Sequence, residues 1–244
     1  MAKKKVKTVK LNQQNEVNVV MKRVLIGMPC GSGLIPWQTA QSLLALHKPP
    51  LTGFLVVERQ RVDKARNYLA MQALQQGFDY LFFIDDDNPI PPDTLEKFLM
   101  ADKDIISAPV LSRNPDTEGN YATCVFGYRE KTIGGKKIKL YKNQSKFKGK
   151  GPLHKVAAVG MACTLIKRHV LEILNIKYKD QMFEFGKIKF KKTEIDGTEY
   201  DTRTTSEDIE FCERAVDAGF EIWIDKRIRP YHITGVTMNQ WKDK

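Results

Sequence analysis

Three consecutive carboxylates, Asp85, Asp86 and Asp87, directly follow the apolar run at 81–84. A short apolar run predicts a strand buried on both faces of a parallel sheet, and open α/β sheets bind ligands at the carboxyl ends of their strands. Two unit charges about 4 Å apart repel each other by roughly 4 kcal/mol at an effective dielectric of about 20. A divalent cation with oxygen ligands would offset this repulsion. The alternative is an acidic surface turn, because Asp-Asn-Pro is a common turn sequence.

A second acidic pair, Glu207 and Asp208, follows Ser206 at the predicted start of a late helix. Serine is a preferred N-cap residue, and acidic side chains in the first turn interact favourably with the helix dipole. The dipole also favours the ionised form that a general base needs. The pattern therefore indicates either two structural acids or a base at Asp208.

The elements that must position these carboxylates alternate between strand and helix, which indicates a parallel, doubly wound α/β sheet. The predicted strands are 23–28, 52–58, 80–84 and 104–108, and the predicted helices are 36–46, 62–76 and one from 91 or 92 to 100. Beyond residue 109, Gly134-Gly135 separates two alternating segments and predicts an antiparallel hairpin. The later predictions are a buried apolar segment at 156–167, a helix near 170–174, a helix from 206 to about 219 and a strand at 221–225.

The net charge of +11 is unevenly distributed over the 244 residues. Five lysines lie within residues 3–10, and ten Lys or Arg with a single acid lie between 129 and 155. Such segments attract phosphate backbones or anionic surfaces, with a solvated basic face as the alternative. DNA or another polyanion is therefore one expected partner.

The four cysteines are far apart in the chain, which argues against a zinc ribbon or a disulfide framework and suits a reducing compartment. We find neither a signal peptide nor an apolar run of the roughly 20 residues that a membrane span requires. A soluble, cytoplasmic protein is expected.

These features occur in the order that is typical of nucleotide-sugar glycosyltransferases of the GT-A class. The carboxylates at 85–87 resemble the Asp-x-Asp motif of that class, and residues 206–208 resemble its Glu-Asp motif. The segment 159–166, with its single glycine, resembles the strand that lines the donor sugar. With Ala-Arg-Asn at 65–67 and a histidine at 232, most of the chain resembles family 2 of the class.

The resemblance implies a GT-A, Rossmann-like fold, in which helices flank a mostly parallel sheet and the hairpin is an antiparallel insertion. It implies a basic leader at 1–20, a single catalytic domain at 21–235 and a C-terminal tail at 236–244. The implied reaction moves one sugar from a nucleoside-diphosphate sugar, with a UDP-sugar favoured, to an acceptor hydroxyl with inversion. Mn²⁺ or Mg²⁺ would stabilise the charge on the leaving diphosphate.

The same resemblance assigns roles to individual residues. Asp208 would be the general base, with Glu207 beside it. The implied metal ligands are Asp85, Asp87 and His232. The implied donor-binding residues are Pro29, Arg66, Asn67, Asp85, Asp86, Gly160 and Ala162. A structural role is the alternative for His232, and a solvated helix position is the alternative for residues 66 and 67.

Two departures from the family pattern qualify the expected substrates. Residues 30–32 are Cys-Gly-Ser where family members usually carry an aromatic residue and an asparagine, which leaves the nucleotide base open. The signature of processive synthases is absent near Trp241, which favours transfer of a single sugar. Trp37, Trp223 and Met161 are predicted to pack within the protein rather than against a sugar.

The acceptor is expected to be polyanionic, such as DNA with hydroxymethylated bases, and a glycan or a lipid-linked acceptor is the competing hypothesis. A metal-dependent nuclease could use the same carboxylates. A nucleic-acid-binding module without turnover is a third hypothesis. The donor sugar, the stereochemical outcome and the oligomeric state stay open.

Overall fold

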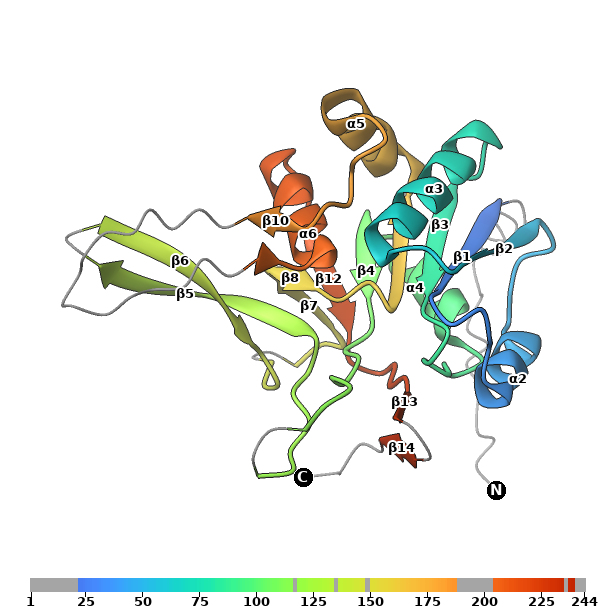
Figure 1. The fold of residues 1–244 in the computed structure, drawn as a ribbon, viewed down its shortest axis with the longest axis horizontal. Coiled ribbons are helices and arrows are strands. Elements are labelled where there is room, and N and C mark those ends of the chain that lie inside the picture. Colours follow the sequence, from blue (N-terminus) through green and yellow to red (C-terminus); the bar gives the residue numbers. More distant parts are fainter. Residues whose placement is uncertain are drawn as a thin grey trace, which may run out of the picture.

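The computed structural model describes residues 22–115, 118–133, 136–147, 150–187, 204–234 and 237–239. Its centre is a seven-stranded sheet with the strand order β2-β1-β3-β9-β4-β12-β7 (Figure 1). These strands are β1 (Val24–Cys30), β2 (Thr52–Glu58), β3 (Tyr80–Ile84), β4 (Ile105–Ser107), β7 (Leu153–Val156), β9 (Cys163–Lys167) and β12 (Ile222–Asp225).

The predicted α/β fold with a mostly parallel sheet is confirmed. Strands β1, β2, β3, β4 and β12 run in one direction, whereas β9 and β7 are antiparallel to their neighbours. Strand β9 reverses because the chain reaches it through a tight turn at 160–162, next to the end of β3, instead of through a crossover helix. The sheet is therefore less uniformly parallel than the alternating pattern predicted.

Five helices in the described ranges cover the two faces of the sheet (Figure 1). They are α2 (Trp37–Ala45), α3 (Val62–Gln75), α4 (Thr94–Ala101), α5 (Arg168–Tyr178) and α6 (Glu207–Asp217). Strand β3 shows how both faces are filled. Leu81 and Phe83 belong to the apolar cluster that includes α3, α5 and α6, whereas Phe82 and Ile84 belong to the cluster that includes α4. The two-sided burial predicted for residues 81–84 is confirmed.

A separate antiparallel sheet has the strand order β6-β5-β8 and extends away from the main sheet (Figure 1). Its strands are β5 (Val125–Ile133), β6 (Lys136–Asn143) and β8 (Ala158–Val159). Ile133 pairs with Lys136, so the predicted antiparallel hairpin is confirmed, and residues 134–135 between the two strands lie outside the described residues. The side chains of the basic residues from 129 to 140 lie outside the described part of the chain.

Two short strand pairs complete the described structure: β10 (Gly186–Lys187) with β11 (Thr204–Thr205), and β13 (His232–Thr234) with β14 (Thr237–Asn239). The predicted boundary between catalytic domain and tail falls between β13 and β14. The predicted leader at 1–20 lies outside the described residues. No described helix is long and apolar enough to cross a membrane. All four cysteines are free thiols.

Candidate active site

The three carboxylates 85–87 lie at the carboxyl end of β3. The backbone N–H of Asp85 donates to the carbonyl of Ala162 at 3.1 Å, which joins the end of β3 to the turn before β9. The chain then turns at once, because the N–H of Asn88 donates to the carbonyl of Asp85 at 3.2 Å. The side-chain amide of Asn88 donates to the carbonyl of Tyr231 at 2.8 Å. The acidic turn is therefore fixed to two distant segments of the chain.

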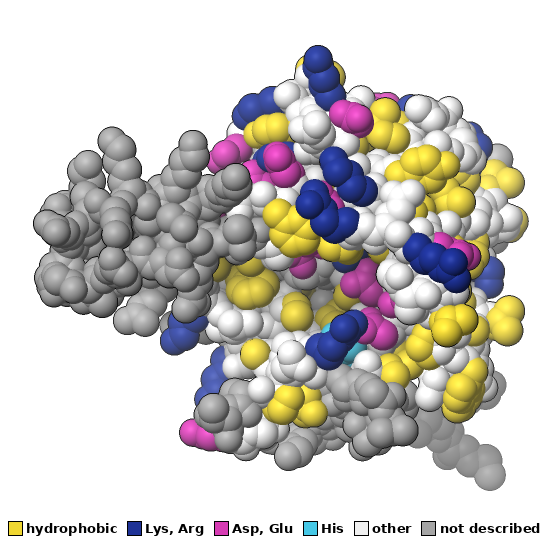
Figure 2. All heavy atoms as spheres, in the orientation of Figure 1, with side chains coloured by type: hydrophobic (Ala, Val, Ile, Leu, Met, Phe, Trp, Pro, Cys, Tyr) yellow, Lys and Arg dark blue, Asp and Glu magenta, His cyan; other side chains and the backbone are white. Residues whose placement is uncertain are grey.

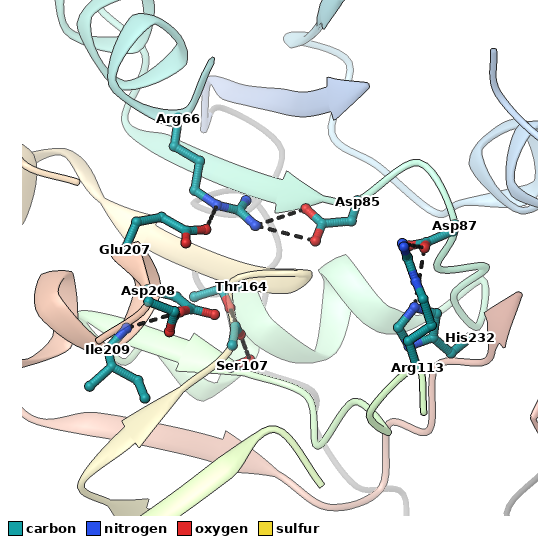
Figure 3. A network of polar contacts seen from close by, with 12 residues as sticks. Arg66, Asp85, Asp87, Ser107, Arg113, Thr164, Glu207, Asp208, Ile209 and His232 are labelled. Carbon is teal, nitrogen blue, oxygen red and sulfur yellow. Dashed lines mark hydrogen bonds and ion pairs between the residues drawn. The ribbon is translucent and has the colours of Figure 1, made fainter. Parts of the chain in front are cut away.

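Arg66 connects this turn to the second acidic motif. It lies near the start of α3, and its guanidinium donates from Nη2 to both carboxylate oxygens of Asp85, at 3.0 and 3.2 Å (Figure 3). Its Nε donates to Oε1 of Glu207 at 3.2 Å. A helix that connects parallel strands begins at the carboxyl edge of the sheet. Helix α3 leads into β3 and α6 leads into β12, so both helices begin at this edge, where Arg66 and Glu207 meet Asp85.

The electrostatics of this group follow from burial. Arg66 is only 2% exposed. Burial alone would lower the pKa of Arg66, but the charges of Asp85, Glu207 and Asp208 outweigh burial and raise it, so the guanidinium stays charged. Burial raises the pKa of Asp85 and of Glu207, and Arg66 only partly offsets this effect. Nη1 of Arg66 has no hydrogen-bond partner among the described residues.

Asp208 has one occupied and one available carboxylate oxygen. The hydroxyl of Ser206 and the backbone N–H of Ile209, at 3.1 Å, both donate to Oδ1. Ser206 occupies the predicted N-cap position, but its hydroxyl binds this carboxylate instead of the helix backbone. Among the described residues no hydrogen bond ends on Oδ2. This oxygen lies beside Gly160, where an added Cβ would come within 3.5 Å of it.

Two buried hydroxyls hold the Gly160 turn in place (Figure 3). Thr164 donates to the hydroxyl of Ser107 at 2.9 Å, and Ser107 in turn donates to the carbonyl of Cys163 at 3.0 Å. Thr164 also lies 3.2 Å from the carbonyl of Gly160. These contacts explain how β4 and β9 keep the glycine close to Asp208.

Asp87 and His232 form a separate pair on the other side of Asp85 (Figure 3). Oδ2 of Asp87 lies 3.1 Å from Nε2 of His232, and Nδ1 of the histidine donates to the carbonyl of Leu111 at 2.7 Å. Arg113 donates a third hydrogen bond, to the same Oδ2 atom of Asp87. Burial alone would shift both groups toward neutrality. The contacts with His232 and Arg113 outweigh it and lower the pKa of Asp87, and the bond to Asp87 raises the pKa of His232.

The predicted metal ligands are only partly brought together. Asp87 and His232 meet, but Asp85 faces Arg66, because α3 places a buried guanidinium beside it. Within the described ranges, no group of three or more His, Cys, Asp or Glu side chains could hold a metal ion. Asp87 and His232 nevertheless suit a divalent ion. Metal-binding histidines commonly donate their second ring N–H to a carbonyl, and Mg²⁺ often takes its remaining ligands from substrate phosphates and water.

The other predicted donor-binding residues differ in where they lie. Pro29 is buried within β1, in register with Val57 of β2. Asn67 does not face the carboxylates: its amide donates to the carbonyl of Phe183 at 2.6 Å and accepts from the N–H of Phe183 at 2.9 Å. This pairing uses both ends of the amide, and Asn67 is buried, so the alternative of a solvated helix position is wrong for Asn67 and the side chain joins α3 to the segment at Phe183. Burial raises the pKa of Asp86, and the nearby Cys30 partly offsets this increase.

Two residues of the site were not expected from the sequence. Arg113 lies in a polar loop between β4 and β5 without a recognisable motif. Cys124 lies beneath the site, with its Cβ 3.0 Å from the Cβ position of Gly160. Burial, followed by the charges of Asp208 and Asp85, raises the pKa of the Cys124 thiol to about 11. Neither position had a signal in spacing or composition.

Comparison with known proteins agrees with this architecture. Residues 55–129 match the model of the Anp1 family. The structure of A197 from STIV is similar, with a TM-score of 0.53 at 16% identity over 91% of this chain and 95% of that one. No curated protein sequence matches.

Two further structures show weaker similarity. A UDP-glucose pyrophosphorylase complexed with UDP-glucose has a TM-score of 0.44 at 9% identity over 86% of this chain and 93% of that one. A mannose-1-phosphate geranyltransferase from Thermus thermophilus has a TM-score of 0.38 at 13% identity over 65% of this chain and 61% of that one. The A197 similarity concerns the fold alone, and together with the Anp1 match it supports a GT-A-like fold for this chain.

Proposed function

We propose that this protein is a metal-dependent glycosyltransferase that moves a single sugar from a nucleoside-diphosphate sugar to an acceptor hydroxyl, with inversion. One observation carries the proposal: Arg66 binds Asp85 and Glu207, so the two acidic motifs meet at the carboxyl edge of the sheet. The Anp1 family is glycosyltransferase-like, and its match at 55–129 includes both Arg66 and the carboxylates 85–87. A family 2 type of site is part of the proposal.

The donor diphosphate has suitable partners in this arrangement. Asp87 and His232 would hold the divalent ion, Mn²⁺ or Mg²⁺, which stabilises the charge that develops on the leaving diphosphate. Nη1 of Arg66 is a buried donor without a partner in the described structure. Leaving such a group unpaired costs about 1–3 kcal/mol, so a phosphate or ribose oxygen of the donor would stabilise it.

Asp208 is the group that would accept the proton of the acceptor hydroxyl. Ser206 and the N–H of Ile209 hold Oδ1, so Oδ2 can face the hydroxyl. As this hydroxyl oxygen bonds to the anomeric carbon, the bond from that carbon to the diphosphate oxygen breaks. The bond electrons leave with the diphosphate, and the hydroxyl proton passes to Asp208. Attack opposite the leaving group inverts the anomeric centre.

For the acceptor we propose a polyanion, with DNA that carries hydroxymethylated bases as the specific hypothesis and a UDP-sugar as the favoured donor. Support comes from the net charge of +11 and from the basic composition of residues 129–155. Glycan and lipid-linked acceptors are the competing hypothesis. The affinity for DNA should fall steeply with salt in the first case, because each phosphate contact releases counterions.

The test of the reaction is a donor-hydrolysis screen with UDP-, GDP-, CMP- and dTDP-sugars and Mn²⁺, in which nucleotide release is followed. We expect one donor to be hydrolysed, and Asp87→Ala or a chelator to abolish the activity. Asp208→Asn should lower the rate by a factor on the order of 10²–10⁴ once an acceptor is present. If calorimetry detects no metal-dependent nucleotide binding, the transferase proposal is wrong. Cleavage of DNA without any sugar donor would support the nuclease hypothesis instead.

A further inference from the structure

Arg113 is held at the site by an ordered segment. Residues 110–112 pair with residues 122–124 of the same loop. The N–H of Ser112 donates to the carbonyl of Ala122 at 2.7 Å, and the N–H of Cys124 donates to the carbonyl of Val110 at 2.7 Å. Leu111, whose carbonyl fixes His232, lies within this pairing. The loop therefore both orients the histidine and supplies Arg113.

The guanidinium of Arg113 binds the carboxylate oxygen that faces His232 (Figure 3). Its side chain is 65% exposed, whereas that of Asp87 is only 14% exposed. Figure 2 shows acidic, basic and histidine side chains gathered at one place on this face of the protein. Arg113 thus approaches a mostly buried carboxylate from the solvent side.

This arrangement makes Arg113 and a divalent cation competitors. A cation bound by Asp87 and His232 needs a carboxylate oxygen close to Nε2, and the guanidinium engages Oδ2, the oxygen that lies beside Nε2. The two positive charges would also repel each other at such short range. Removing the guanidinium alone would leave the mostly buried Asp87 with one positive partner fewer, but an incoming cation replaces that charge, so the exchange does not leave Asp87 uncompensated.

We propose that Arg113 is a diphosphate-binding residue that the incoming cation displaces from Asp87. Without substrate, the guanidinium occupies the cation position at Asp87. When a cation and a nucleoside diphosphate enter together, the guanidinium moves to a phosphate oxygen, which it can bind with two hydrogen bonds. This inference rests on the proposed function and adds to it: the cation and the nucleotide bind cooperatively, because the nucleotide gives the displaced Arg113 a new partner.

The test measures binding rather than turnover. Free Mn²⁺ is quantified by electron paramagnetic resonance, and nucleotide affinity is measured by calorimetry with Mn²⁺ and UDP, GDP or dTDP in turn. Arg113→Ala should raise the affinity for Mn²⁺ alone by about fivefold and lower the nucleotide affinity by about 5- to 50-fold, in the range of typical coupling between sites. Arg113→Gln, which keeps the side-chain carbons up to Cδ and a polar end group but removes the charge, should behave in the same way.

Arg168→Ala is the matched control. This substitution also removes a guanidinium that contacts a carboxylate, that of Glu172. Arg168 directly follows Lys167, which pairs with Tyr80 at the start of β3, so it lies at the edge of the sheet opposite to the carboxylates 85–87. Neither affinity should change in this variant.

Two results would overturn the inference. If Arg113→Ala and Arg113→Gln bind Mn²⁺ alone as the unmodified protein does, Arg113 does not compete with the cation. If they bind Mn²⁺ more weakly, Arg113 supports the site instead of blocking it. Both results leave the proposed function intact as long as the unmodified protein binds a nucleotide with Mn²⁺ and Asp87→Ala does not. If the unmodified protein binds none, the function and the inference fail together.

Discussion

Arg66 shows how much a single buried charge can control. It binds carboxylates that lie 19 and 141 positions away in the chain. A buried ion pair contributes little net stability compared with an apolar pair, but removing one partner leaves the other charge buried and unpaired. Without Arg66, Asp85 and Glu207 would keep their desolvation and lose the charge that offsets it.

Arg66→Ala should therefore lower the free energy of unfolding by about 3–5 kcal/mol, the usual cost of breaking a buried pair. Urea unfolding followed by circular dichroism measures this change. Arg168→Ala, which breaks a partly exposed pair with Glu172, should cost less than about 1 kcal/mol. An equal, small effect of the two substitutions would contradict the electrostatic role of Arg66.

Cys124 provides a residue-scale prediction on pH. Its pKa of about 11 means that roughly one thiol in a thousand is ionised at pH 8, and the thiolate is the reactive form. We expect Cys124 to resist Ellman's reagent at pH 8 in the folded protein and to react as the pH approaches 11 or the chain unfolds. The readout is mass spectrometry of the labelled protein with Cys124→Ala as the control. Fast labelling at pH 8 would show that the thiol is neither buried nor close to the carboxylates.

Individual site residues could be predicted from the sequence only where they stand in a recognisable short motif. Asp85 and Asp208 could be found because they stand in short acidic motifs next to predicted strand and helix ends. The role of Asn67 could not be predicted from the sequence, because its hydrogen-bond partner Phe183 lies 116 positions away in the chain. Trp37 was expected to pack within the protein and is 69% exposed, so that prediction is wrong.

At the scale of elements, the turn between β8 and β9 matters most for the site. The N–H of Gly160 donates to the carbonyl of Cys124 at 2.7 Å, and a β-carbon added at Gly160 would meet both Cys124 and Oδ2 of Asp208. This added β-carbon would lie 3.0 Å from that of Cys124, which is tighter than nine in ten such contacts in proteins. Cys124 or the turn would have to shift by a few tenths of an ångström, whereas the 3.5 Å to Oδ2 of Asp208 is an ordinary contact.

Gly160→Ala should therefore reduce kcat by a few-fold to about tenfold, less than the roughly 10²-fold effect of a 1 Å displacement at a catalytic group, because the contact with Cys124 requires a shift of only a few tenths of an ångström. Gly151→Ala is the matched control: a β-carbon there meets nothing within 4 Å. Steady-state kinetics on the donor found in the screen would measure both variants. Equal kcat values would contradict the close fit between the turn and Asp208.

The positions of the helices and strands in the chain were predicted better than the directions of the strands and the ends of the helices. Strand β3 and the hairpin at 134–135 follow from apolar runs and glycine pairs, which are local signals. Helix α4 begins at Thr94 and not at 91 or 92, because Thr94 caps the preceding turn by donating to the carbonyl of Pro91. An apolar run also carries no information on direction, so the antiparallel orientation of β9 could not be read from the sequence.

The whole molecule carries its positive charge unevenly, and part of that charge lies near the root of the hairpin. Lys142 and Lys146 are exposed at the end of β6 and in the loop that follows. If the acceptor is a polyanion, these side chains contribute to long-range attraction, and this attraction depends on salt.

Changing Lys142 and Lys146 to glutamate should weaken binding to duplex DNA and reduce the slope of log K against log salt by about 0.9 for each phosphate that the protein no longer neutralises. Fluorescence anisotropy at several salt concentrations gives this slope. The same change at Lys177 and Lys179, which are exposed at the end of α5, keeps the net charge equal and should have a smaller effect. If both pairs behave alike, the attraction reflects net charge alone and the polyanion hypothesis loses its support.

The position of β9 between β3 and β4 also has a consequence for synthesis on the ribosome. Strands β3 and β4 are translated long before β9, yet they never pair with each other and must wait for residues 163–167 to join them. Until then β3 has one open apolar edge and β4 has two, because its other neighbour, β12, is translated later still, and open edges favour association with other chains. Asp85 and Arg66 are likewise translated well before Glu207. A nascent chain stalled after β4 should therefore bind holdase chaperones more strongly than one stalled after β9 has emerged, and full release should require β12.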